Sequence, residues 1–142
     1  MKLSKLVVTL SIAAGMMAFG SGELFAQDSS GTWSVNFGPN AKNWGIAGVT
    51  KDFLKFNDHV SLFVTGGMNT TLVGGGAAYY VTSFHKSSFV FSSTIGVVGA
   101  HADAAYQWKV SKRGFLTTGV SYGAYFMQYE GILPVLSYEI RF

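Results

Sequence analysis

The sequence predicts an all-β fold, an antiparallel up-and-down transmembrane β-barrel of about eight strands. Three observations lead to this prediction. Apolar and polar residues alternate over most of residues 32–142, short groups of turn-forming residues interrupt the alternation, and only 12% of the chain is charged. Alternation with a period of two is the pattern of a strand with one apolar face. Soluble domains have roughly 25% charged residues, so the composition favours a barrel whose apolar face meets lipid.

The chain begins with a predicted signal peptide at residues 1–26. Two lysines precede an apolar stretch of fourteen residues, 6–19, and Ala26 offers a small residue for cleavage. This three-part layout is typical of a secretory signal peptide. The stretch is shorter than the roughly 20 residues that a spanning helix needs. We therefore expect an exported protein, with residues 27–31 as a linker and 32–142 as the barrel.

Charge and cysteine content exclude several classes of function. Without the signal peptide, eight Lys and Arg stand against six Asp and Glu, a net charge of +2 that is scattered along the chain. Nucleic-acid binding would need a basic patch or stripe in the sequence. The chain has no cysteine, and its three histidines are far apart. We therefore expect no disulfide, no metal and no cofactor.

The first half of the barrel is predicted to contain strands at residues 32–38, 44–56, 59–68 and 71–84. Large apolar side chains alternate with polar or small ones in these segments. The groups that separate them contain Pro-Asn, Asn-Asp, Asn-Thr and His-Lys-Ser, which are common in turns. The first segment is the shortest. The others approach or exceed the roughly 9 to 11 residues that a tilted spanning strand requires.

The second half is predicted to contain strands at residues 88–99, 102–111, 115–129 and 133–142. Here the alternation is clearest, with aromatic and aliphatic side chains on one face and Ser, Thr, Gly or charged ones on the other. The expected turns between these strands are residues 100–101, 112–114 and 130–132.

Polar side chains on the inward face are expected to fill the interior. A barrel of about eight strands has room mainly for side chains, and charges buried there must be paired. We expect a network of salt bridges and hydrogen bonds, with the lining of a narrow pore as the rival interpretation. The expected members are Asp103, Gln107, Lys109, Glu139 and Arg141, together with Lys51.

Aromatic residues near the ends of the predicted strands favour the aromatic girdles that mark the two membrane interfaces. The main candidates are Trp33, Trp44, Trp108, Phe126 and Tyr129, with Phe84, Phe89 and Phe115 at similar positions. Any one of these residues could instead belong to a packed core.

The last predicted strand ends in the alternating pattern Tyr138-x-Ile140-x-Phe142. Together with the signal peptide and the strands, this pattern resembles bacterial outer-membrane β-barrel proteins, and by size the small eight-stranded OmpA/OmpX type. The resemblance covers residues 32–142. It implies a bacterium of Gram-negative type, both termini in the periplasm, and recognition of the C-terminal aromatic residue by the outer-membrane assembly machinery. The chain departs from many such proteins in its short loops and in Pro134, which we expect near the rim.

The expected role is structural or envelope-associated, without enzymatic activity. The interior is predicted to be too full for a diffusion channel, and the loops are too short to present a binding surface. The expected partners are outer-membrane lipid and the assembly machinery. A monomer is expected, although several copies could combine into a larger barrel. A narrow channel and a soluble periplasmic lipid-binding barrel are the non-enzymatic alternatives.

A lipid-modifying enzyme is a further alternative. His85 and Ser87 form a His-x-Ser pair, which resembles that of the outer-membrane lipid A deacylases. The pair falls at a predicted turn, and no Glu is clearly placed beside it. His101 lies at the rim and is followed by Asp103 on the same face. With Ser121 and Glu130 they could supply a catalytic triad only if the fold brought these residues together.

Overall fold

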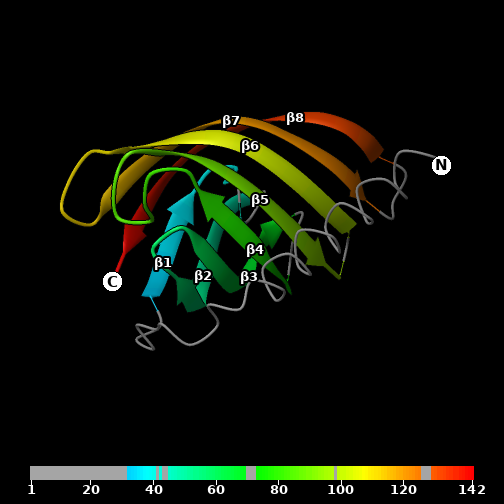
Figure 1. The fold of residues 1–142 in the computed structure, drawn as a ribbon. Helices are drawn as coiled ribbons and strands as arrows, with labels where there is room; N and C mark the ends of the chain where they lie inside the picture. Colours follow the sequence, from blue (N-terminus) through cyan, green and yellow to red (C-terminus); the bar gives the residue numbers. More distant parts are fainter. Residues whose placement is uncertain (1–31, 41, 43–44, 70–72, 98, 126–128) are drawn as a thin grey trace.

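The computed structural model describes residues 32–40, 42, 45–69, 73–97, 99–125 and 129–142. These residues form one closed antiparallel barrel in which each strand pairs with its sequence neighbours and the last pairs with the first (Figure 1). The predicted all-β, antiparallel up-and-down barrel of about eight strands is thereby confirmed. In this part of the chain no helix has the length and apolar character needed to cross a membrane. The predicted signal peptide and linker lie outside the described residues.

Eight strands make up the barrel. They are β1 (Thr32–Phe37), β2 (Gly45–Phe56), β3 (Val60–Asn69), β4 (Val73–Tyr80), β5 (Ser88–Gly96), β6 (Gly99–Lys109), β7 (Gly114–Tyr125) and β8 (Tyr129–Arg141). We call the end at which β1 begins and β8 finishes the terminal end, and the other the opposite end.

Three strand boundaries differ by four residues from the sequence prediction, and one of them is the end of β7, which lies at Tyr125 instead of residue 129. β4 ends at Tyr80 instead of residue 84, and β8 begins at Tyr129 instead of residue 133. The expected turns at residues 100–101 and 130–132 lie within β6 and β8. His101, for example, continues the inward face of β6 instead of forming a turn.

The β2–β3 turn shows how local sequence shapes the barrel. Asn57 and Asp58 have φ values of 50° and 57°, and the amide of His59 donates to the carbonyl of Phe56 at 3.0 Å. Two central residues with positive φ are characteristic of the type I′ turn, whose twist matches that of a hairpin. Asn and Asp tolerate this conformation better than most residues. The predicted Asn-Asp turn therefore has a clear physical basis.

The side chains of each strand alternate between the lumen and the exterior. In β5, Ser88, Ser92 and Thr94 are buried, whereas Phe89 and Phe91 are 56% and 49% exposed. Among the described residues, buried polar or charged side chains outnumber buried apolar ones. The interior is therefore mainly polar and much of the exterior is apolar.

A β-bulge changes this alternation within β2. The register between β2 and β3 shifts between Asp52 and Leu54. As a result both Asp52 and Lys55, three residues apart, are buried, and the ammonium group of Lys55 donates to the Thr32 hydroxyl at 2.6 Å. Simple counting by twos would have placed these two side chains on opposite faces.

The closing strands pair over only part of their length. β1 pairs with β8 from Ser34 to Phe37, so the first half of β8 extends beyond the end of β1. The amide of Leu136 donates to the Pro39 carbonyl at 3.0 Å, which shows that the nitrogens of even-numbered residues here face the β1 side. Pro134 therefore lies within β8 instead of near its rim, with its nitrogen toward the side on which β1 has ended. A proline can occupy such a position because no ladder hydrogen bond is lost.

Candidate functional site

The segment between β1 and β2 enters the lumen from the opposite end. We call it the inner loop, and its described residues are Gly38, Pro39, Asn40 and Lys42. Gly38 has a φ of 86°, a backbone conformation that favours glycine. The Asn40 amide donates to the Ser137 hydroxyl at 2.8 Å and to the Glu139 carboxylate at 3.1 Å. Because Ser137 and Glu139 are buried residues of β8, these bonds hold the loop inside the barrel.

Lys42 carries a positive charge deep into the lumen. Its Nζ lies 2.7 Å from Asp52 Oδ1, and both side chains are almost completely buried. Its Nζ also lies 5.4, 5.5 and 5.0 Å from the ring centroids of Phe63, Tyr80 and Phe84. Burial alone would disfavour the charged form, but the Asp52 carboxylate, together with Tyr80 and Glu139, outweighs it and raises the pKa of Lys42 above its usual value. Lys42 therefore remains an ammonium ion held by a carboxylate and three ring faces.

The β4–β5 turn fills the lumen from the terminal end. Its Phe84 is 1% exposed, and the Phe84 amide donates to the Asp58 carbonyl at 2.7 Å. The Gln107 side chain donates to the carbonyls of Phe84 and Lys86 at 3.3 and 2.6 Å. Phe84 thus packs inside the barrel, as does Phe115 at 2% exposure. Neither residue takes part in an external girdle.

Arg141 connects these two inward-turned segments. It donates to the Glu139 carboxylate, to the Phe84 carbonyl, and at 2.8 Å to Gln107 Oε1. Its guanidinium group lies 4.1 Å from the ring centroid of Phe84 and 3.8 Å from that of Phe115. A planar guanidinium can make such hydrogen bonds and ring contacts together, which a lysine could not reproduce. The terminal half of the lumen is therefore a continuous polar and aromatic network.

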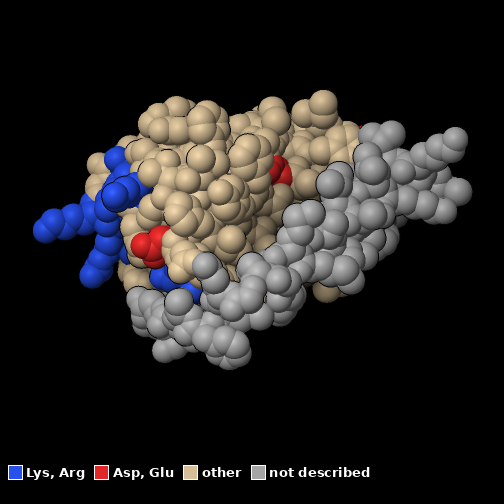
Figure 2. Space-filling view, viewed as in Figure 1, with Lys and Arg blue, Asp and Glu red and all other residues tan. Residues whose placement is uncertain are grey.

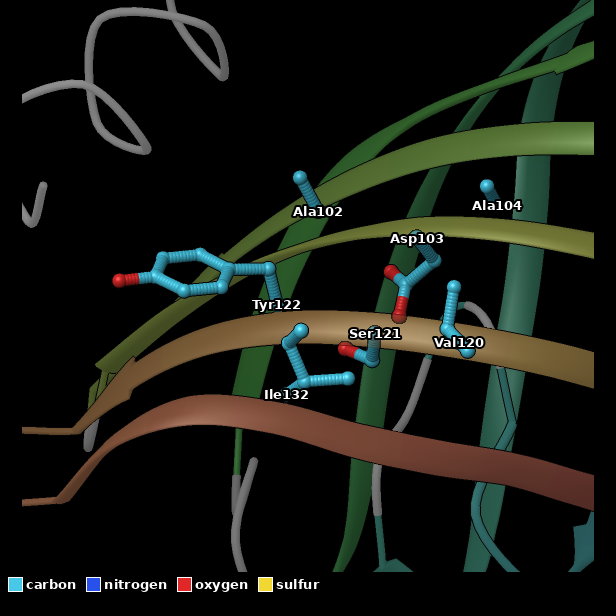
Figure 3. A pocket seen from close by; sticks show the side chains of 7 residues that line it. All are labelled: Ala102, Asp103, Ala104, Val120, Ser121, Tyr122 and Ile132. Atoms are coloured by element: carbon cyan, nitrogen blue, oxygen red, sulfur yellow. The ribbon is translucent and has the colours of Figure 1, made fainter.

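A second polar cluster lies toward the opposite end. His101 Nδ1 is 2.7 Å from Asp103 Oδ2, and the Ser92 hydroxyl donates to the same oxygen at 3.2 Å. Ser121 faces Asp103 from β7 and lies beside it in Figure 3. In the described part of the chain, His101 Nε2, Asp103 Oδ1 and Ser121 Oγ are buried without a hydrogen-bond partner.

This cluster provides an oriented imidazole but no complete catalytic triad. A carboxylate on Nδ1 is the arrangement that positions a histidine as a base, and a nucleophile would have to reach Nε2. No such contact exists among the described residues. Glu130, which the sequence suggested as a partner, is exposed and accepts a hydrogen bond from Tyr122. The described residues also contain no group of three His, Cys, Asp or Glu that could hold a metal ion.

A shallow apolar groove of about 350 Å³ lies on the outer surface of β6, β7 and β8 (Figure 3). Small Ala102 and Ala104 lie beside the larger Val120, Tyr122 and Ile132 along this groove. Asp103 and Ser121 also line it, but their side chains are buried on the lumen side of the strands, so we interpret the groove as part of the apolar exterior.

The remaining predicted lumen residues lie outside the polar network. Lys109 is exposed at the end of β6, with its Nζ 6.0 Å from the ring centroid of Phe115. Lys51 faces the exterior, because its neighbours Thr50 and Asp52 face the lumen, and its Nζ is 5.1 Å from the Trp33 ring centroid. Of the predicted network, four members are buried in the lumen, namely Asp103, Gln107, Glu139 and Arg141.

The predicted His85 and Ser87 pair has other partners. His85 Nε2 lies 3.8 Å from Asp58 Oδ1, and the side chains of both residues are more than half exposed. Ser87 Oγ accepts a hydrogen bond from the amide of Lys109 at 2.9 Å. The geometry therefore gives the His-x-Ser pair no support as a catalytic site.

Apart from Phe84 and Phe115, the predicted interfacial residues lie on the outer surface where their side chains are described. Trp33 and Trp108 are 50% and 41% exposed. Tyr138 and Phe142 are also exposed, Ile140 is half-buried, and the amide of Phe142 donates to the Trp33 carbonyl at 2.7 Å. Trp44 and Phe126 lie outside the described residues, as does the side chain of Tyr129.

Comparison with known proteins gives no independent indication of function. No protein-family model matches the chain, and no curated protein or solved structure matches it significantly. The closed eight-stranded antiparallel barrel is consistent with the OmpA/OmpX-like fold.

Proposed function

We propose that this protein is an integral β-barrel of a bacterial outer membrane, with a structural or envelope-associated role. The observation that carries the proposal is the apolar exterior. Val49, Val64, Phe91, Val120 and Leu136 are each at least 44% exposed, although all five lie within strands. An apolar surface that recurs around a barrel marks contact with lipid or protein. In a soluble barrel such side chains would fill the interior.

The composition of the lumen supports the same proposal. Charged residues such as Asp52, Glu139 and Arg141 are buried, where they are paired or hydrogen-bonded. Placing charges inside and large apolar groups outside is the arrangement that a barrel needs in hydrocarbon. A soluble lipid-binding barrel would instead need an apolar cavity for its ligand.

A structural role is favoured over a channel because the terminal half of the lumen is occupied. Lys42 from the opposite end and Phe84 from the terminal end meet with 5.0 Å between the ammonium nitrogen and the ring centroid. Arg141 packs against the same ring. We therefore expect no unit conductance steps in planar bilayers after insertion has been verified by protease protection. Regular steps would favour the narrow pore.

We also propose that the protein is not an enzyme. His101 is only 1% exposed, and its Nε2 contacts no nucleophile among the described residues. The mass spectrum of lipid A should therefore be the same in cells with the wild-type protein, the His101→Asn variant or no copy of the gene. A change in lipid A acylation that His101→Asn abolishes would instead favour the lipid-modifying alternative.

Two matched substitutions test membrane insertion. Val120 lies in the middle of β7 and Val110 just beyond the end of β6, and they are 53% and 55% exposed. In a bilayer, Val120→Arg should lower the free energy of unfolding by roughly 2–4 kcal/mol, and Val110→Arg by only about 0–1 kcal/mol. In water both changes should remain within about 0.5 kcal/mol of the wild type.

The measurement is urea unfolding of the full chain in phospholipid vesicles, monitored by heat-modifiable gel migration and by tryptophan fluorescence. Equal, small effects of the two substitutions would contradict the membrane assignment, because an arginine deep in a bilayer should cost more than one near its surface. Release of the native protein from membranes without detergent would contradict it as well.

A further inference from the structure

The exposed positive charges gather at one end of the barrel. Four exposed cationic residues lie in the turns or at the strand ends of the terminal end, and we call them the basic rim. They are Lys86, Lys109, Lys112 and Arg113. Figure 2 shows Lys and Arg side chains projecting at the left, the end at which Figure 1 places the end of β8.

Hydrogen bonds that each involve a backbone group hold the turns of the basic rim close together. Gln107 donates to the Lys86 carbonyl at 2.6 Å, and the amide of Lys109 donates to Ser87 Oγ at 2.9 Å. The amide of Arg141 donates to the Arg113 carbonyl at 2.8 Å. The β4–β5 and β6–β7 turns are therefore fixed beside each other and beside the end of β8. Their cations project from an ordered surface.

Negative charge does not balance the basic rim. Asp58 is the one exposed acidic residue at this end in the described part of the chain, because Asp52 and Glu139 are buried in the lumen, and its Oδ1 lies 3.8 Å from His85 Nε2. Partial burial, and then the positive charge of Lys55, lower the pKa of His85, with smaller contributions from Arg141 and Lys109 that Asp58 only partly offsets. The potential around this turn is therefore positive.

The opposite end has a different character. Its one exposed charged residue among those described is Glu130, which accepts a hydrogen bond from Tyr122. No described lysine or arginine is exposed at this end. Lys42, which enters the lumen from there, is buried against Asp52. The two ends would thus meet different headgroup layers if the barrel spans a bilayer.

We infer that the basic rim binds the phosphate groups of anionic phospholipids in the leaflet at the terminal end. The inference rests on the proposed function and adds a lipid class to it. An arginine can bind a phosphate through two parallel hydrogen bonds, and lysines attract it as point charges. Trp33 and Trp108 are exposed on strands β1 and β6, which reach this end, and such rings favour the headgroup level. The rim and the two tryptophans therefore define one interfacial layer.

The experiment compares lipid retention by the folded full chain. The protein is refolded into vesicles of phosphatidylcholine with a minority of phosphatidylglycerol and extracted gently, and native mass spectrometry then determines the bound lipids. The wild type should retain phosphatidylglycerol in preference to phosphatidylcholine. The double variant Lys112→Gln/Arg113→Gln should weaken this preference by about fivefold for each charge removed. The double variant Lys112→Arg/Arg113→Lys, which keeps both positive charges, is the control and should change it little.

Two further arms identify the ligand. Preference for phosphatidylglycerol should fall as salt rises, because exposed charges are screened. Inorganic phosphate at the concentration of the lipid phosphate should not displace the lipid, and full displacement would show that the rim binds free phosphate instead. Equal retention of the two lipids by the wild type would overturn the inference, as would an unchanged preference in the double variant.

The design separates failure of this inference from failure of the proposed function. A chain that folds and inserts into vesicles of phosphatidylcholine alone, but shows no lipid preference, overturns only the role of the basic rim. A chain that inserts into neither kind of vesicle overturns the proposed function and the inference together.

Discussion

The two halves of the lumen differ in how their polar groups are partnered. In the terminal half, Arg141 contacts Glu139, Gln107 and Phe84, and each of these residues has further contacts. In the half toward the opposite end, small serines surround Asp103, and three buried polar atoms have no partner among the described residues, against two in the terminal half, Asp52 Oδ2 and Ser61 Oγ. One half is thus packed by large, mutually bonded side chains. The other half has small hydroxyl groups and more unpartnered polar atoms.

The difference shows that strands alone do not fill this barrel. Many residues that line the lumen are small, among them Ser34, Thr50, Ser61 and Ser137. The inner loop and Phe84 occupy the space that these residues leave. A barrel of about eight strands must fill its interior with side chains. Here, segments outside the strands supply a large part of that filling.

The largest effect is expected from breaking the Lys42 and Asp52 pair. Lys42→Met would remove the cation that pairs with the Asp52 carboxylate, which is 0% exposed. The free energy of unfolding should therefore fall by about 3–5 kcal/mol. The double variant Lys42→Met/Asp52→Leu should recover much of this loss, because it removes both charges. Urea unfolding in phospholipid vesicles provides the measurement, and Lys51→Met controls for loss of a lysine. If Lys42→Met changes stability no more than Lys51→Met, the inner loop does not anchor the lumen.

A smaller effect is expected from Gln107, which links β6 to the β4–β5 turn. Gln107→Met keeps a side chain of similar length but removes the acceptor for Arg141 and the donor for the carbonyls of Phe84 and Lys86. Leaving buried groups unpaired costs about 1–3 kcal/mol. The loss should be accompanied by faster proteolysis of the β4–β5 turn, because Lys86 would no longer be held. Unchanged stability together with unchanged proteolysis would show that the turn is held by Phe84 packing alone.

The sequence predicted the barrel well because its signals are local and repeated. Alternation identified all eight strands and assigned the faces of β5 and β6 correctly, since each strand needs only a period of two. It failed where the chain departs from that period. The bulge in β2 brought Asp52 and Lys55 to the same face, and β8 begins earlier because Glu130 and Gly131 continue a strand despite their turn-like composition.

The lumen was predicted only in part, because it depends on contacts between distant segments. Asp103, Gln107, Glu139 and Arg141 lie on inward positions that alternation can identify. Asn40 and Lys42 were assigned to a turn, and no periodic signal indicates that a turn will enter the barrel. Phe115 could have been predicted to face the lumen, because it lies two residues from Thr117 on the inward face of β7. The inward position of Phe84 could not have been predicted in this way, because Phe84 lies beyond the end of β4, where alternation no longer applies.

The smallest effect is expected at Ser121, and it tests the contrast between the two halves directly. The hydroxyl of Ser121 has no partner among the described residues, whereas that of Ser137 accepts a hydrogen bond from Asn40 at 2.8 Å. Ser121→Ala should therefore change the free energy of unfolding by less than about 0.5 kcal/mol, while Ser137→Ala should cost about 1 kcal/mol. Both serines are buried, and each loses a single oxygen atom. If Ser121→Ala costs as much as Ser137→Ala, an ordered water molecule bonds the Ser121 hydroxyl, and the half around Asp103 is as fully bonded as the half around Arg141.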